Sequence, residues 1–219
     1  MVKMLSFIDN ALNLIYPNVC GFCDKIHKSN LCPKCEIELN NLAKFKIDYY
    51  NNKYFSKHLY IFKYEGIIKN KLIDYKFNQK TYIYKGLIEF IIKNKKFCEI
   101  LKSYDIIIPV PIHYFRKVKR GYNQSELLAN GIAKKLDLNY KNNVLKKVKN
   151  NKPQSTKNKK DRIENVVNAY NIKHKDVLVG KNIILLDDIF TTGSTVNECA
   201  KILQQNGAKD IAIITIAKD

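Results

Sequence analysis

The stretch at residues 183–196, IILLDDIFTTGSTV, constrains the fold more than any other part of the sequence. Its four leading aliphatic residues are typical of a parallel strand that is buried on both faces. Two adjacent carboxylates follow, and then a small Thr-Gly-Ser turn. Because two neighbouring acids repel each other and suit no hydrophobic core, the stretch predicts a strand that ends at a ligand site.

The remaining sequence alternates short apolar runs with segments of helical spacing, which indicates an α/β fold with a doubly wound parallel sheet and flanking helices. The polar, lysine-rich segment 149–162 predicts a long mobile loop. We expect strands at residues 58–64, 105–110, 143–148, 182–186 and 210–217, and helices at 1–15, 34–42, 66–77, 82–95, 124–136 and 196–205.

The order of strand, acids and turn suggests which ligand the site takes. In an open α/β sheet, ligands bind beyond the carboxyl ends of the strands, and a turn that opens a helix suits a phosphate. Asp187 and Asp188 cannot help the same phosphate, so we expect them to accept hydrogen bonds from vicinal sugar hydroxyls. The predicted ligand is a ribose 5-phosphate moiety, with its phosphate held by Thr191, Thr192, Gly193, Ser194 and Thr195.

This pattern resembles the phosphoribosyl-pyrophosphate (PRPP) binding motif of type I phosphoribosyltransferases: four apolar residues, two acids, two apolar residues, then Thr-Thr-Gly-Ser-Thr. A haloacid dehalogenase-like phosphatase would need Asp-x-Asp-x-Thr, which is absent, and a response regulator would need later lysine and threonine strand ends. A strand with acidic terminal residues and a helix cap, without a ligand, is the remaining alternative.

Two further segments resemble the ComF family of competence-associated, phosphoribosyltransferase-like proteins. Residues 106–136 carry Pro-Val-Pro, a basic run and Arg-Gly-Tyr-Asn-Gln, and residues 152–170 carry the family's Pro-Gln, Arg, Asn and Ala-aromatic spacing. A double CxxC near the N-terminus is also a feature of that family, so the resemblance extends from about residue 5 to the end. Lys157 and Asn168 depart from the family pattern, which typically has an apolar residue and a glycine there.

The resemblance implies a type I phosphoribosyltransferase-like sheet and a role for each matching residue. Asp187 and Asp188 would hold the ribose hydroxyls, and Mg²⁺ would accompany PRPP by bridging pyrophosphate and ribose oxygens. The backbone of Val110 and Pro111, with Ile112, would bind pyrophosphate. Gln154 and Arg162 would belong to a loop that closes over PRPP and stabilises the leaving charge, although Arg162 could instead pair with a neighbouring acid.

Four of the six cysteines lie in CGFCDKIHKSNLCPKC, as Cys20-x2-Cys23 and Cys32-x2-Cys35. Two such knuckles can close a tetrahedral zinc site, and because cysteine fills all four positions, the metal would be structural. A redox pair or an iron–sulfur cluster are the alternatives. We therefore expect a helix and a small four-cysteine zinc-finger module at residues 1–45, and the phosphoribosyltransferase-like α/β domain at 46–219.

The formal charge of +19, from 39 basic and 20 acidic residues, bears on partners. Residues 138–160 contain eight lysines and no acid, and HYFRKVKR at 113–120 adds more cations. A surface of one sign attracts polyanions such as single-stranded DNA or phosphorylated metabolites, although a biased codon usage would also enrich lysine. Tyr114, Phe115 and Tyr122 could stack on bases, with at least one tyrosine expected in the core.

Nothing in the sequence marks an acceptor site, so two functions stay open. In the first, suggested by the family's association with natural transformation, the chain binds PRPP and handles incoming single-stranded DNA, and competence or recombination proteins are its candidate partners. In the second, it is an active phosphoribosyltransferase with an unidentified acceptor. No run of about 20 apolar residues that could span a membrane is present. We therefore expect a cytoplasmic protein without membrane insertion.

Overall fold

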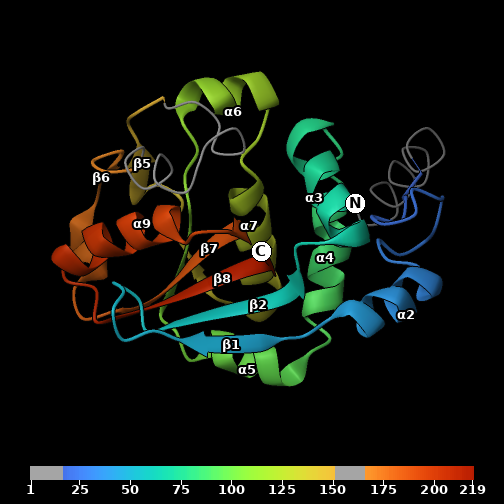
Figure 1. Ribbon diagram of the computed structural model, residues 1–219, viewed down its shortest axis with the longest axis horizontal. Coiled ribbons are helices and arrows are strands. Elements are labelled where there is room, and N and C mark those ends of the chain that lie inside the picture. The colour runs from blue at the N-terminus through green and yellow to red at the C-terminus, as the bar shows by residue number, and fades with distance from the viewer. Residues whose placement is uncertain (1–16, 151–165) are drawn as a thin grey trace, which may run out of the picture.

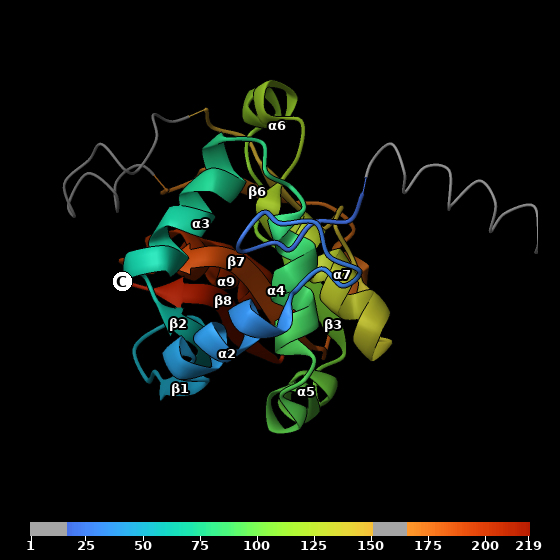
Figure 2. The same ribbon diagram turned by 90° about the vertical axis from the view of Figure 1, so that its right-hand side faces the viewer.

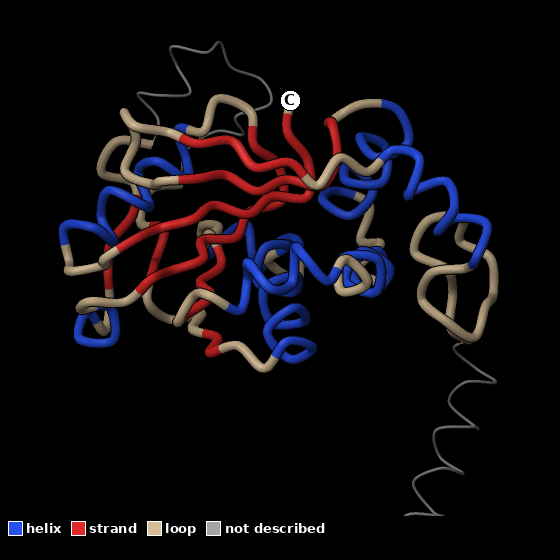
Figure 3. The backbone as a smooth tube through the Cα atoms, turned by 90° about the horizontal axis from the view of Figure 1, so that it is seen from below, coloured by secondary structure: helices blue, strands red, loops and turns tan. Residues whose placement is uncertain are grey.

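Strands β7 (Asn182–Phe190) and β8 (Asp210–Lys218) form the middle of a six-stranded sheet in a computed structural model, which describes residues 17–150 and 166–219. The strand order is β1-β2-β8-β7-β3-β4, and the strands lie in one twisted layer with helices on both sides (Figures 1 and 3). All neighbours are parallel except the edge pair β1–β2. The remaining strands are β1 (Lys46–Tyr49), β2 (Lys57–Lys63), β3 (Ile106–Pro109) and β4 (Asn139–Tyr140).

Helices cover both faces because the side chains of β7 alternate between two hydrophobic clusters. Ile184 and Leu186 pack in the cluster that includes α3 (Gly66–Phe77), α4 (Ile83–Ile91) and α7 (Gln124–Leu136). Ile183 and Leu185 pack in the other cluster, with α9 (Ser194–Gln205). The predicted α/β fold with a largely parallel sheet is therefore confirmed.

The connections around β3 and β7 create the place where a ligand is expected to bind. The chain leaves β3 through α6 (Tyr114–Arg120) and α7 to reach β4, and it leaves β7 through α9 to reach β8 on the other side. Adjacent parallel strands whose connections diverge in this way open a crevice at their carboxyl ends. In this chain the corresponding position is where Val110 follows β3 and where Asp187 and Asp188 approach the end of β7.

Three of the predicted elements need correction. The helix expected at 82–95 is two helices, α4 and α5 (Lys95–Lys102), because Asn94 caps α5 by accepting a hydrogen bond from the Phe97 N–H at 2.9 Å. The strand expected at 182–186 continues to Phe190, since β8 pairs with it throughout, so the two acids lie within the strand and not after it. The strand expected at 143–148 is shorter, β5 (Leu145–Lys147), and lies outside the main sheet.

Strand β5 pairs antiparallel with β6 (Tyr170–Ile172) in a two-stranded sheet, followed by the short helix η2 (Lys175–Leu178). The buried side chains of Leu145, Tyr170 and Leu178 join the cluster beneath α9. The small sheet therefore lies on the α9 side of the main sheet. The expected helices at 66–77 and 124–136 are confirmed with those bounds, and the expected helix at 1–15 lies outside the described residues.

The cysteine-rich segment packs beside α4, where its loop and the short helix α2 (Pro33–Leu42) lie next to each other (Figure 2). Its buried Phe22 and Leu31 belong to the same hydrophobic cluster as α4. The backbones approach closely at Gly86, where an added Cβ would lie 2.8 Å from the Asn30 carbonyl oxygen. The core is thus continuous across residue 45, and the division into two domains stays a prediction.

Within the described residues, no helix has the length and apolar character that crossing a bilayer requires.

Candidate functional site

The acid pair at the end of β7 is the centre of the candidate site. Asp188 is 6% exposed, and the ammonium of Lys76 on α3 lies 3.0 Å from its Oδ2. Asp187 has different partners: the Ser125 hydroxyl, at the start of α7, donates to its Oδ1 at 2.9 Å, and the Asp188 N–H donates to the same oxygen at 2.9 Å. The two carboxylates are therefore not equivalent, because only Asp188 has an ammonium partner among the described residues.

The electrostatics of the pair follow from this arrangement. Burial, together with the negative charge of Asp188, raises the pKa of Asp187 to about 7, although Lys76 and the hydrogen bonds from Asp188 and Ser125 act in the opposite direction. For Lys76, burial would lower the pKa, but the two carboxylates outweigh it and raise the pKa above its ordinary value. Near neutral pH the acid pair therefore holds less than two full negative charges, and Lys76 stays charged.

A set of hydrogen bonds joins the last turn of α3 to the first turn of α7. The Tyr75 hydroxyl donates to the Gln124 carbonyl at 2.9 Å, and the Gln124 side-chain amide donates to the Lys76 carbonyl at 3.3 Å. The Tyr122 hydroxyl donates to the Tyr75 carbonyl. These hydrogen bonds, which we call the α3–α7 clamp, fix the backbone of Lys76. Ser125 directly follows Gln124 on α7, so the side chains of Lys76 and Ser125 both reach the acid pair. The expectation that a tyrosine of this region lies in the core is met by Tyr122, which is 9% exposed.

The turn after β7 has the backbone that a phosphate site requires. Gly193 has φ 72° and is the N-cap residue of α9, and an added Cβ there would lie 2.5 Å from Cζ of Phe190. The Thr192 and Ser194 hydroxyls are 2.7 Å apart, and residues 191–195 are all partly exposed. The first N–H groups of a helix have no acceptor within it, so this turn offers both amide and hydroxyl donors to an anion. The structure thus places Asp187 and Asp188 near the carboxyl end of β7 and the five predicted turn residues directly after that strand.

The loop after β3 differs in detail from what the resemblance implies. The Val110 N–H donates to the Leu186 carbonyl at 2.8 Å, and the Val110 carbonyl accepts from the Asn123 side-chain amide at 3.0 Å. Pro111 has no N–H. Of the three residues predicted to hold pyrophosphate, Ile112 is therefore the one whose amide is left for a ligand. Gln154 and Arg162, predicted for the closing loop, lie outside the described residues.

Two further cations, which the sequence did not assign to the site, act on the charges of the acid pair. The Lys147 ammonium lies over the Tyr170 ring, 5.1 Å from its centroid, and burial lowers the pKa of Lys147. Arg120 donates to the Gln124 side-chain oxygen at 2.5 Å and lies over the Phe77 ring, 5.6 Å from its centroid. Sequence reasoning grouped these residues with a solvated basic surface. No local pattern marks Lys76, because a lysine in the last turn of a helix is common and α3 has apolar residues only at helical spacing.

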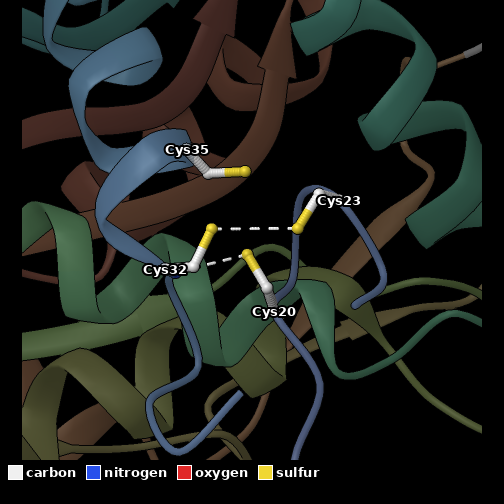
Figure 4. A group of neighbouring side chains, drawn as sticks. All are labelled: Cys20, Cys23, Cys32 and Cys35. Atoms are coloured by element: carbon white, nitrogen blue, oxygen red, sulfur yellow. Dashed lines mark hydrogen bonds between the residues drawn. The ribbon is translucent and has the colours of Figure 1, made fainter. Parts of the chain in front are cut away.

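The four cysteines predicted to bind zinc form one cluster in the structure (Figure 4). Their Sγ atoms all lie within 4.8 Å of one another, and those of Cys23 and Cys32 are 3.8 Å apart. Metal–sulfur bonds of about 2.3 Å in a tetrahedron require sulfur atoms roughly 3.8 Å apart, so the donor set fits zinc. The Cys32 N–H also donates to Cys20 Sγ at 3.4 Å, which would stabilise a thiolate ligand. All four cysteines are free thiols, so the cluster can bind a metal.

Removal of the metal is expected to loosen the cysteine module and destabilise the whole chain, because Cys20 and Cys35 belong to the main hydrophobic cluster. A Cys20→Ser, Cys23→Ser variant should contain less than about 0.1 zinc per chain and unfold at least about 5 °C below the wild type. Elemental analysis and thermal unfolding measure both quantities. Cys98→Ser, at a buried cysteine outside the cluster, is the control for loss of a thiol and should keep one zinc per chain. Full zinc content in the double variant would contradict the assignment.

The sheet, the acid pair in β7 and the glycine turn that follows it define a phosphoribosyltransferase-like protein, and the model of the phosphoribosyl transferase domain matches residues 107–219. The chain belongs to the ComF/ComFC competence protein family, as the N-terminal cysteines and the near-full-length relatives show.

Three relatives illustrate the extent of the similarity. Competence protein F of Haemophilus influenzae is 30% identical over 213 residues, which cover 94% of this chain and 93% of that protein. Competence protein ComFC of Streptococcus pneumoniae is 26% identical over 216 residues, which cover 98% of this chain and 87% of that protein. DNA utilization protein YhgH of Escherichia coli O157:H7 is 31% identical over 109 residues, 50% of this chain and 47% of that protein. Among solved structures, an adenine phosphoribosyltransferase is 16% identical with a TM-score of 0.37, covering 61% of this chain and 70% of that one.

Proposed function

We propose that this chain binds PRPP with Mg²⁺ at the end of β7 and handles incoming single-stranded DNA in the cytoplasm during natural transformation. The observation that carries the first half is the succession of Asp187, Asp188 and the Gly193 turn along one strand and into α9. The names of the relatives, two competence proteins and a DNA utilization protein, support the second half.

The geometry suggests how each part of PRPP is held. The carboxylates accept hydrogen bonds from the two ribose hydroxyls, and the Gly193 turn receives the 5′-phosphate through backbone N–H groups and the Thr192 and Ser194 hydroxyls. Mg²⁺ supplies charge neutralisation to the pyrophosphate oxygens. The Ser125 hydroxyl fixes the orientation of Asp187, so the ribose meets a carboxylate that is already in place.

Helix α6 supports a role in binding single-stranded DNA. It lies at the periphery of the molecule in two perpendicular views (Figures 1 and 2), and none of its residues is buried. Tyr114, Phe115 and Val118 are each more than 60% exposed, and Lys117 and Lys119 lie on the same short helix. Aromatic side chains that stack on bases, between cations that contact the backbone, are the usual means of binding a single strand without sequence preference.

Substitution of the exposed aromatic residues of α6 is expected to weaken binding of single-stranded DNA. A Tyr114→Ala, Phe115→Ala variant should bind a fluorescent oligothymidylate at least about 30-fold more weakly at a fixed salt concentration, because two stacking contacts are lost. Its dependence on salt should stay that of the wild type, since no phosphate contact is removed. Fluorescence anisotropy over a salt series measures both quantities.

The matched control is Tyr49→Ala, which removes an aromatic side chain of 74% exposure from β1, at the opposite edge of the sheet from β4. It should leave DNA binding unchanged. Equal weakening in both variants, or none in the α6 variant, would contradict the assignment of this surface.

An active phosphoribosyltransferase in nucleotide metabolism or salvage, with an unidentified acceptor, is the second candidate function, favoured by the family model matched over residues 107–219. It predicts release of pyrophosphate from PRPP in the presence of Mg²⁺ and a base or amine. A broad panel of acceptors tests it in a coupled pyrophosphate assay. PRPP binding without turnover on any acceptor would favour PRPP as a ligand of a DNA-handling protein.

A further inference from the structure

Lys76 has a position in the site that neither the sequence pattern nor the role of the acid pair explains. Its ammonium contacts both oxygens of Asp188, at 3.0 Å and 3.3 Å, yet its side chain is 31% exposed while that of Asp188 is 8% exposed. The ion pair thus has one shielded partner and one partner that a ligand can reach.

The backbone of Lys76 is held in place by the α3–α7 clamp, the hydrogen bonds among Tyr75, Lys76, Tyr122 and Gln124. Three of these four residues are at most 9% exposed. A solvent-exposed ion pair typically contributes less than about 1 kcal/mol to stability. The stability of the Lys76–Asp188 pair alone therefore does not explain a buried set of hydrogen bonds that holds the Lys76 backbone. The buried clamp instead delivers one cation to one position beside the sugar-binding acids.

That position differs from the place expected for the 5′-phosphate. Helix α3 belongs to the hydrophobic cluster on the face of Ile184 and Leu186, and α9, which the Gly193 turn begins, belongs to the cluster on the opposite face. Arg120 lies on the Lys76 side as well, where burial lowers its pKa and the charge of Asp188 opposes that effect. The site therefore has two regions that suit anions, one at the turn and one at Lys76 and Arg120.

We propose that Lys76 is a ligand-binding residue that pairs with Asp188 in the free protein and with the pyrophosphoryl group in the PRPP complex. The inference rests on the proposed binding of PRPP. When Asp188 accepts a hydrogen bond from a ribose hydroxyl, the Lys76 ammonium loses part of its pairing with that carboxylate. Its exposed side can then contact a second anionic group, and a charge-assisted hydrogen bond to that group would replace the lost contact. The pyrophosphoryl group supplies that charge on the side opposite the 5′-phosphate.

Two ligands that differ in the pyrophosphoryl group separate this role from simple support of Asp188. Titration calorimetry with Mg²⁺ compares PRPP with ribose 5-phosphate on the full zinc-loaded chain. Lys76→Gln should weaken PRPP at least about 10-fold and ribose 5-phosphate less than about 3-fold, as expected for the loss of a charge-assisted hydrogen bond to one group. Lys76→Arg, which keeps the charge, should recover most of the PRPP affinity.

Lys93→Gln is the matched control, since it removes another ion pair, which joins Lys93, just after α4, to Glu36 on α2 at 2.6 Å. It should alter neither affinity. An equal loss for both ligands in Lys76→Gln would show that Lys76 acts only through Asp188, and no loss would show that the ion pair is incidental; either result overturns the inference. Failure of PRPP binding itself would be visible in the wild-type titration alone and would overturn the proposed function as well.

Discussion

Asp187→Asn is expected to abolish measurable PRPP binding while making the folded chain more stable at pH 8. Binding should fall at least about 100-fold, because a neutral amide accepts hydrogen bonds from sugar hydroxyls more weakly and also presents an N–H group to them. Stability should rise because burial and the charge of Asp188 raise the pKa of Asp187 to about 7 from an ordinary value of 3.8. The same carboxylate therefore serves the ligand at a cost to the fold.

The pH dependence follows from that raised pKa. Between about pH 4 and pH 7 the folded chain keeps a proton on Asp187 that the unfolded chain has lost, so the free energy of unfolding falls as the pH rises through this range. A difference of about three pH units sets a ceiling of roughly 4 kcal/mol. Because Asp187 is partly exposed and Lys76 lies near it, we expect the substitution to recover about 1–2 kcal/mol at pH 8 and almost nothing at pH 4.

Urea unfolding at pH 4 and pH 8 measures this difference, and titration calorimetry measures the loss of binding. Asp176→Asn, at an exposed position on η2, is the control for loss of one negative charge and should change neither quantity. A destabilised Asp187→Asn chain at pH 8, or one that binds PRPP as the wild type does, would contradict the electrostatic account of the acid pair.

Gly193→Ala is expected to weaken PRPP binding at least about 10-fold and to destabilise the fold by about 1–3 kcal/mol. Two causes act together. The residue has φ 72°, which L side chains adopt only with strain, and its new Cβ would lie 2.5 Å from Cζ of Phe190. Relief of that contact moves the backbone of the turn, and the N–H groups that the phosphate requires move with it.

The chain offers a control for each cause. Gly180 has φ 70° with nothing within 4 Å of an added Cβ, so Gly180→Ala should show the strain of the backbone without loss of PRPP affinity. Adding Phe190→Ala to Gly193→Ala removes the ring and should restore part of the affinity, although the core loses an aromatic side chain. Calorimetry and thermal unfolding compare the four proteins. Equal affinity losses in the two glycine variants would show that the contact with Phe190 is irrelevant.

The main elements could be predicted from the sequence because their patterns are local. The buried strands β3, β7 and β8 are short aliphatic runs, and α3 and α7 have apolar residues at helical spacing. The break between α4 and α5 was missed, since apolar spacing continues across it and the cap at Asn94 is a single residue. Strands β1 and β4 were missed because edge strands need no continuous apolar run.

For the site, the sequence supplied the residues that follow one another on the chain. Asp187, Asp188 and the Gly193 turn lie in one stretch, and the four cysteines lie in two regular knuckles. Lys76 and Ser125 come from segments more than 60 residues before the acid pair, and only the packing of α3 on α7 brings them to it. The role of Val110 also depends on tertiary structure, since its N–H is used by the neighbouring strand.

A crystal structure of the full zinc-loaded chain with PRPP and Mg²⁺ tests the central claim most directly. The account predicts the ribose 2′ and 3′ hydroxyls within hydrogen-bonding distance of the carboxylates of Asp187 and Asp188, and the 5′-phosphate against the backbone N–H groups of the turn at Gly193. A ribose bound away from the end of β7, or a 5′-phosphate held by other residues, would contradict it.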